Sequence, residues 1–129
     1  MITEDYVSFE IAKLLKEKGF DESTSMVYMS YDHLCKLDRY DSIRNSNYND
    51  ITKNYFEYTA PTLQMAMAWL REHKMYIMID RSWSVKNSWQ YCICVNDNFD
   101  HLIKQESIPN RTYEEAVEAA IRYCLENLI

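Results

Sequence analysis

Glycine is almost missing from this chain. Gly19 is the only one among 129 residues, and Pro61 and Pro109 are the only prolines. An all-β sandwich or barrel needs many tight turns, which depend on these two residue types, so the shortage argues against such folds. It also argues against a glycine-rich phosphate-binding loop, because no second glycine exists to build one.

Positive charge is also in short supply. The chain has 14 Lys and Arg against 20 Asp and Glu, a formal net charge of −6. Proteins that bind nucleic acid usually present a basic patch or stripe. The densest basic run here, Lys13, Lys16 and Lys18, is interleaved with Glu10 and Glu17, which is typical of the solvated face of a helix. We therefore expect no direct binding of nucleic acid.

Long hydrophobic runs are missing as well. No segment approaches the roughly 18 apolar residues of a membrane-spanning helix, and the acidic start Met1–Asp5 does not begin like a secretory signal. The sequence therefore predicts a cytoplasmic protein that does not bind membranes. In that reducing compartment the four cysteines are expected to be free thiols. They are Cys35, Cys92, Cys94 and Cys124.

The chain does contain three stretches with the apolar spacing of amphipathic helices. The first includes Val7, Ile11 and Leu15 and ends at Gly19. A glycine at that position can adopt the left-handed conformation of a Schellman cap, which would fold Phe20 back onto Leu15.

The other two helices have recognisable starts. Pro61, a proline suited to a first helical turn, precedes the apolar stripe of residues 63–70. Thr112 and Glu115 have the spacing of a capping box, and an apolar stripe then continues to Leu128. Both segments are therefore predicted to be helices.

Strands are indicated by short aromatic or alternating runs. We predict them over residues 26–31, 75–80 and 89–96, with a short edge strand at 102–103. Residues 84–88 would close a hairpin between the second and third of these strands. The two-residue period places the odd-numbered residues of both hairpin strands against the helices.

Together these segments predict an α+β fold in the order α-β-(loop)-α-β-β-α. Three helices would pack on a small, mainly antiparallel sheet of three to four strands, and residues 1–129 would form a single domain. Residues 36–58 show no clean periodicity, so we expect a long connection there, with a short helix around 50–57.

Tyrosines gather in this connection among Asn, Ser and Asp. Tyrosine offers a large contact area at low entropic cost, and Ser and Asn offer adaptable hydrogen bonds, as in binding loops. We therefore predict binding residues at four positions, which are Tyr40, Tyr48, Tyr55 and Tyr58. The alternative is that these side chains pack on the domain's own surface.

No catalytic or metal-binding set is recognisable in the sequence. Asp32, His33 and Cys35 are close together, but cysteine triads are assembled in space and adjacency in sequence is not their signature. The thiols of Cys92–Cys94 would need Cys35 or His101 to complete a zinc site, and the paired ligand spacing of such sites is absent. We therefore assign no catalytic residue, no metal ligand and no cofactor.

Three stretches carry a resemblance: residues 6–20 (YVSFEIAKLLKEKGF), 60–72 (APTLQMAMAWLRE) and 113–129 (YEEAVEAAIRYCLENLI). They resemble the start, the central helix and the C-terminal helix of small uncharacterised proteins encoded by phages, prophages and mobile elements of gut anaerobic bacteria. Residues 32–58 and 81–110 show no such likeness. The resemblance implies an origin in mobile DNA and a bacterial cytoplasm, and it brings no activity, cofactor or catalytic residue with it.

These observations favour a non-enzymatic protein-interaction module that recognises another protein through residues 38–58 and the nearby sheet. Two alternatives stay open: an acidic decoy of a DNA-binding protein, motivated by the net charge, and a small hydrolase using His33 and Cys35. Self-association is a further expectation. The wide apolar face of the second helix, together with Met78 and the sheet cysteines, would be covered in a homodimer.

Overall fold

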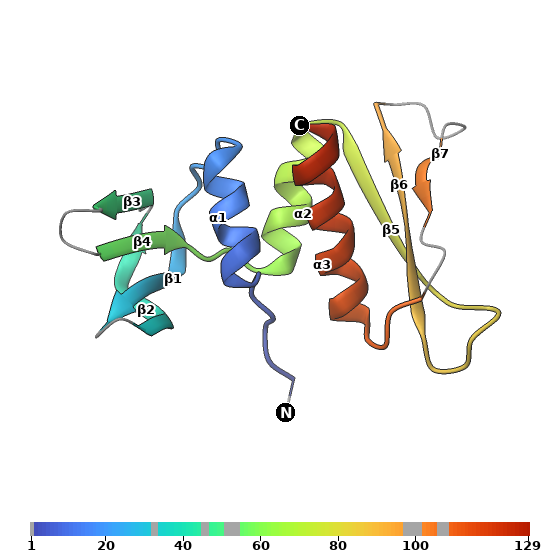
Figure 1. Ribbon diagram of the computed structural model, residues 1–129, viewed down its shortest axis with the longest axis horizontal. Helices are drawn as coiled ribbons and strands as arrows, with labels where there is room; N and C mark the ends of the chain where they lie inside the picture. The colour runs from blue at the N-terminus through green and yellow to red at the C-terminus, as the bar shows by residue number, and fades with distance from the viewer. Residues whose placement is uncertain (1, 32–33, 45–46, 51–54, 97–101, 106–108) are drawn as a thin grey trace. The chain divides into compact units, whose positions relative to one another are not determined.

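The structure is a computed structural model (Figure 1). It describes residues 2–31, 34–44, 47–50, 55–96, 102–105 and 109–129. The contacts divide the chain into two compact units, Met1–Thr62 and Leu63–Ile129, and each is described by itself. A single domain over residues 1–129 stays a prediction.

The first unit combines one helix with a four-stranded sheet. Its elements are α1 (Phe9–Glu17), β1 (Thr24–Tyr31), β2 (Leu34–Arg44), β3 (Asn47–Asp50) and β4 (Tyr55–Thr59). The strand order across the sheet is β2-β1-β4-β3, and every neighbouring pair is antiparallel. The helix α1 contacts β4.

The C-terminal end of α1 has the predicted cap. Gly19 has a φ of +98°, and its N–H donates to the Lys16 carbonyl at 3.1 Å. The Phe20 N–H donates to the Leu15 carbonyl at 2.9 Å, which completes the hydrogen-bond pair of a Schellman motif. Phe20 and Leu15 are both buried, so the cap also closes an apolar contact.

The N-terminal end of α1 is tied to the sheet. The Ser8 hydroxyl caps the helix by accepting from the Ile11 N–H at 3.4 Å. One residue earlier, the Val7 carbonyl accepts from the Tyr28 hydroxyl at 2.7 Å, and the Val7 N–H donates to the Pro61 carbonyl at 3.0 Å. These bonds connect the start of α1 with β1 and with the end of the unit.

Aromatic rings fill the space between α1 and its sheet. The ring of Phe9 lies 5.8 Å from Tyr28, 5.2 Å from Phe56 and 5.8 Å from Tyr58, measured between centroids. The Lys16 ammonium lies 4.8 Å from the centre of the Tyr58 ring, a cation–π contact. We call these five residues the aromatic cluster.

The prediction of a long connection over residues 36–58 is wrong. That segment contains most of β2, all of β3 and all but the last residue of β4. The expected helix around 50–57 is also wrong where the structure describes it, because Tyr55–Thr59 is a strand; residues 51–54 lie outside the described residues. The reason is visible in β2, where residues 35–39 are all exposed. A strand without a buried face has no alternating pattern to reveal it.

The second unit packs two helices on a three-stranded sheet. Its elements are α2 (Leu63–Glu72), β5 (Met75–Arg81), β6 (Trp89–Val95), β7 (Leu102–Gln105), α3 (Tyr113–Tyr123) and a final π-helical turn, η1 (Cys124–Leu128). The sheet order is β5-β6-β7, with antiparallel pairs throughout. The helix α2 contacts β5 and α3, and α3 contacts β5 and β6.

The predicted alternation in β5 and β6 is confirmed. Met75, Tyr91 and Ile93 are buried, whereas Met78 and Asp80, on the opposite face, are exposed. The odd-numbered face is therefore the one that packs. The buried Cys94 is an exception on the even-numbered face.

The start of α3 carries the predicted cap. The Thr112 hydroxyl accepts from the Glu115 N–H at 3.1 Å. The Glu115 carboxylate reaches back to the N–H of Arg111 at 3.1 Å, one residue before the position of an ideal capping box. The predicted stripe to Leu128 continues through η1, where Cys124 and Leu125 are buried.

The α+β class, the three helices and the antiparallel pairing are confirmed. The arrangement differs in one respect, because the described strands form two sheets instead of one. β1 finds its partners, β2 and β4, within residues 34–59, so it does not need the strands of the second unit. A long connection without strands would have left β1 to pair with them.

The Gly19 cap makes a stability prediction. Gly19→Val should lower the free energy of unfolding by about 1–2 kcal/mol, because a β-branched residue rarely adopts a positive φ. No described atom lies within 4 Å of the position a Cβ would take, so the loss comes from backbone conformation and not from a clash. Urea denaturation followed by circular dichroism measures it.

Gly19→Asn is the matched control, since asparagine tolerates this region better than valine and should cost less. Equal stability of the valine variant and the wild type would contradict the cap.

Candidate interaction site

The strands β5 and β6 are joined by a turn that hydrogen bonds hold in place. The Ser82 N–H donates to the Ser88 carbonyl at 2.9 Å, which closes the base of the turn. The Ser82 hydroxyl accepts from the Val85 N–H at 3.1 Å. Asn87 has a φ of 58°, a conformation that asparagine tolerates better than most residues. We call residues 81–89 the hairpin tip.

The hairpin tip presents a tryptophan to solvent. Trp83 is 97% exposed and Val85 is 46% exposed. Arg81 and Lys86 are exposed too, and the tip contains no acidic residue. The Arg81 guanidinium stacks 5.1 Å from the ring centre of Trp89, so one cation lies over a neighbouring ring. Tryptophan is usually well buried in a monomer and enriched at the centre of interfaces, which makes this exposure a functional signal.

Trp83 was not among the residues that the sequence pointed to. The alternation of β5 and β6 predicts a hairpin, and the structure confirms it. The serines on both sides of Trp83 could have signalled that this ring lies in a turn, where apolar side chains have little to pack against.

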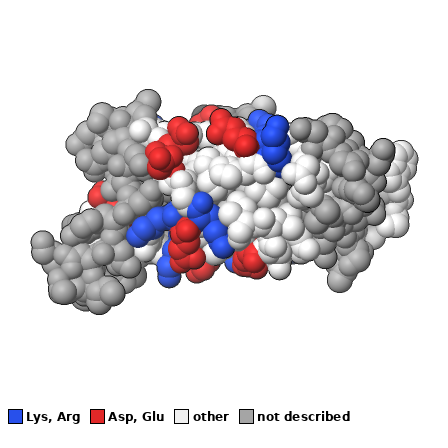
Figure 2. Space-filling model, turned by 90° about the horizontal axis from the view of Figure 1, so that it is seen from above, with Lys and Arg blue, Asp and Glu red and all other residues white. Residues whose placement is uncertain are grey.

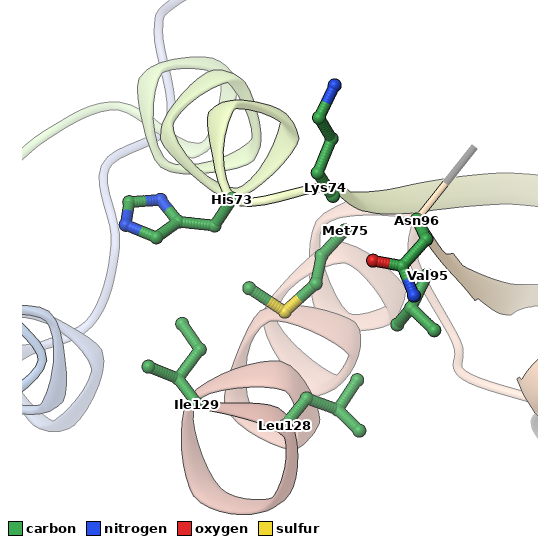
Figure 3. Close-up of a pocket in the computed structure, with 7 residues that line it drawn as sticks. All are labelled: His73, Lys74, Met75, Val95, Asn96, Leu128 and Ile129. Atoms are coloured by element: carbon green, nitrogen blue, oxygen red, sulfur yellow. The ribbon is translucent and has the colours of Figure 1, made fainter.

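A hollow lies at the other end of the same two strands (Figure 3). Its volume is about 350 Å³, and its lining is His73, Lys74, Met75, Val95, Asn96, Leu128 and Ile129. Figure 3 shows Met75, Leu128 and Ile129 facing the same space. The wall is therefore largely apolar, with an imidazole, an ammonium and an amide at its rim.

Two left-handed residues shape the edge of this hollow. Lys74 has a φ of 63° and Asn96 a φ of 58°. The Asn96 N–H donates to the Lys74 carbonyl at 2.7 Å, so the end of β6 is joined to the turn before β5. The hollow has room for a small apolar group.

His73 at this rim is held by Trp69. Its Nδ1 lies 2.9 Å from the Trp69 carbonyl, and its ring centroid lies 4.1 Å from that of Trp69. A histidine at the C-terminal end of a helix can donate a hydrogen bond to a backbone carbonyl that has no donor within the helix. His73 therefore has a packing and capping explanation without catalysis.

The four tyrosines predicted to bind lie in different environments. Tyr58 is 3% exposed and belongs to the aromatic cluster, while Tyr55 is half-buried. Tyr40 lies in β2 and Tyr48 in β3, and their side chains lie outside the described residues. The burial of Tyr58 fits the alternative that this ring covers the core. A binding role for the four residues stays a prediction.

The thiols show no sign of activation. Burial raises the pKa of the exposed Cys35 thiol above its ordinary value, although only part of the group is desolvated. Burial also raises the pKa of Cys92, with smaller contributions from Asp80 and Cys94. It raises the pKa of Cys124 to about 12. A raised pKa lowers the fraction of thiolate, which is the nucleophilic form.

The catalytic and zinc alternatives involve Asp32, His33 and His101, which lie outside the described residues. Within the described part of the chain, no three His, Cys, Asp or Glu side chains gather to hold a metal ion. In that same part, no helix is long and apolar enough to cross a membrane.

Comparison with protein families, with curated proteins and with solved structures finds no match to this chain. Its function therefore has to be inferred from its own residues.

The thiol environments make a chemical prediction. Cys35 should react first with iodoacetamide because it is exposed, and its rate should keep rising with pH beyond about 8.5, the ordinary thiol value. Intact-mass spectrometry over a pH series measures this rate, and Cys35→Ser identifies the adduct.

A rate for Cys35 that levels off below neutral pH would show an activated thiol and would restore the hydrolase alternative. Cys124 is the internal control, since it should stay unlabelled until the protein is unfolded.

Proposed function

We propose that this protein is a non-enzymatic protein-interaction module whose hairpin tip inserts Trp83 into an apolar pocket of a partner protein. The observation that carries the proposal is the exposure of Trp83 on a hydrogen-bonded turn. An isolated exposed apolar side chain is ordinary, but a whole indole held in solvent by a fixed turn is not.

The size of the indole sets the energy scale. A tryptophan buries about 150–250 Å² in an interface. At roughly 25 cal/mol per Å², that burial is worth about 4–6 kcal/mol before ordering costs are subtracted. Those costs are reduced here, because two hydrogen bonds already order the turn: the Ser82 N–H donates to the Ser88 carbonyl, and the Val85 N–H donates to the Ser82 hydroxyl. Trp83 can therefore supply a large share of the affinity of a micromolar complex.

Charge favours an acidic rim around that pocket. Arg81 and Lys86 flank Trp83, although the chain as a whole carries a net charge of −6. An acidic partner would attract the cationic tip and repel the rest of this acidic protein. The two proteins would therefore meet with the tip facing the partner. Nucleic acid and membrane are not the proposed partners, since both present far denser negative charge to the whole molecule.

The decoy alternative is the weaker candidate on charge. Figure 2 shows basic side chains next to acidic ones among the described residues. Near the C-terminal end, Arg122 of α3 and Glu126 of η1 form an ion pair at 3.5 Å. An acidic decoy needs its carboxylates gathered on one face.

The proposal includes the setting expected from the sequence. The protein would be encoded by a phage, prophage or mobile element and would act in a bacterial cytoplasm. Its partner would then be a protein of that cell, and a second copy of the chain is a further candidate partner. No observation favours a cofactor or a catalysed reaction.

The test compares Trp83→Ala with the wild type of the full chain. Affinity capture from a bacterial lysate selects candidate partners, and isothermal titration with each purified candidate measures affinity. Removing the indole should weaken binding by about 30-fold or more, the effect of a hot-spot residue. Trp83→Phe should lose less, since it keeps an aromatic ring.

Lys13→Ala is the control, because it alters an exposed residue outside the hairpin tip and should leave binding unchanged. Tyr40→Ala in the same assay tests the predicted tyrosine surface separately. Unchanged affinity of Trp83→Ala for every purified partner would contradict the proposal.

A further inference from the structure

The strand β2 lies at one end of the four-stranded sheet (Figure 1). It pairs with β1 on one side, and no described strand lies on its other side. Residues 35–39 are exposed, including Leu37 at 40%. A strand edge of this kind is a ready template for another strand.

Hydrogen bonds show which backbone groups of β2 point outward. The Met26 carbonyl accepts from the Ala60 N–H at 3.0 Å, so Met26 faces β4, and the next residue, Val27, faces β2. Val27 is paired with Asp38, and Met29 with Lys36. Both β2 residues therefore turn their backbone groups toward β1.

The alternate residues of β2 then turn their N–H and C=O groups away from the sheet. These residues are Cys35, Leu37 and Arg39. The Arg39 N–H confirms this direction, because it donates to the Asp38 carboxylate at 2.8 Å and not to a strand. The outer edge thus offers outward donors and acceptors at Cys35 and Leu37, while at Arg39 the N–H would have to exchange its bond to Asp38 for one to the second copy.

This edge is complementary to itself. In an antiparallel pair centred on Leu37, the two copies of Leu37 lie opposite each other. Lys36 of each copy then lies opposite Asp38 of the other. Lys36 and Asp38 turn their backbone groups inward, so these are the closely spaced, non-hydrogen-bonded pairs in which side chains approach best.

The neighbouring registers are unfavourable. Two other registers also place outward-facing residues of the two copies opposite each other. One is centred on Lys36 and the other on Asp38. The first register sets Lys36 against Lys36, and the second sets Asp38 against Asp38, so like charges face each other directly. Charges on an edge strand normally prevent pairing; here they favour the register centred on Leu37 over its two neighbours.

We propose that a second copy of the chain pairs with the outer edge of β2, antiparallel and centred on Leu37, to join two four-stranded sheets across a two-fold axis. The edge of β2 would be the surface through which a second copy binds, and this pairing does not depend on the hairpin tip. The interaction is isologous, so it closes as a dimer. One short strand pair buries less than the about 1,200 Å² of stable complexes, so the dimer is weak.

Charge reversal tests the register. Lys36→Asp alone places Asp opposite Asp38, and Asp38→Lys alone places Lys opposite Lys36. Each variant should dimerise about tenfold more weakly than the wild type in sedimentation velocity, because both cross-strand pairs become repulsive. The double variant restores opposite charges and should dimerise like the wild type.

Mixing the two single variants is the most demanding test. A Lys36→Asp copy opposite an Asp38→Lys copy regains both ion pairs, so the mixture should form a heterodimer at wild-type affinity. Loss of folding in a variant cannot imitate this rescue. Lys13→Asp and Asp21→Lys, equal charge changes at exposed positions elsewhere, are the controls and should leave dimerisation unchanged.

Two outcomes overturn the inference: a wild-type protein that stays monomeric up to about 1 mM, or single variants that dimerise as well as the wild type. Trp83→Ala should dimerise normally, which separates this result from the test of the hairpin tip.

Discussion

The antiparallel pairing of β1 with β2 on one side and β4 on the other organises the first unit. Because β4 is held beside β1, Phe56 and Tyr58 meet Phe9 of α1 and complete the aromatic cluster. The same pairing leaves the outer side of β2 at the end of the sheet. Core and interaction edge are thus consequences of one set of backbone hydrogen bonds.

Strand pairing also organises the second unit. The odd-numbered face of β5 and β6 packs, and the two strands run antiparallel, so the hairpin tip and the hollow lie at opposite ends of these strands. At one end the turn lifts Trp83 into solvent, and at the other Met75 lines a hollow. The exposed indole is the feature on which the proposed function rests.

The candidate site was the part least accessible to sequence reasoning. The tyrosines of residues 36–58 suggested binding by composition, yet Tyr58 is a core residue. Trp83 was not predicted as a site. The sequence between two strands is the same whether its aromatic side chain packs on the domain or points into solvent. The strand β2 and its edge were not predicted for a related reason. A strand exposed on both faces has no alternation of apolar and polar residues.

The sequence by itself determined what depends on near neighbours. The Schellman cap at Gly19, the cap of α3 at Thr112 and the alternation of β5 and β6 could all be read from local spacing, because their hydrogen bonds or faces involve residues a few positions apart. Only the tertiary structure decided that the strands form two sheets, that Tyr58 is buried and that Trp83 is exposed. Strand partners and burial depend on residues distant in the chain, and local spacing contains no record of them.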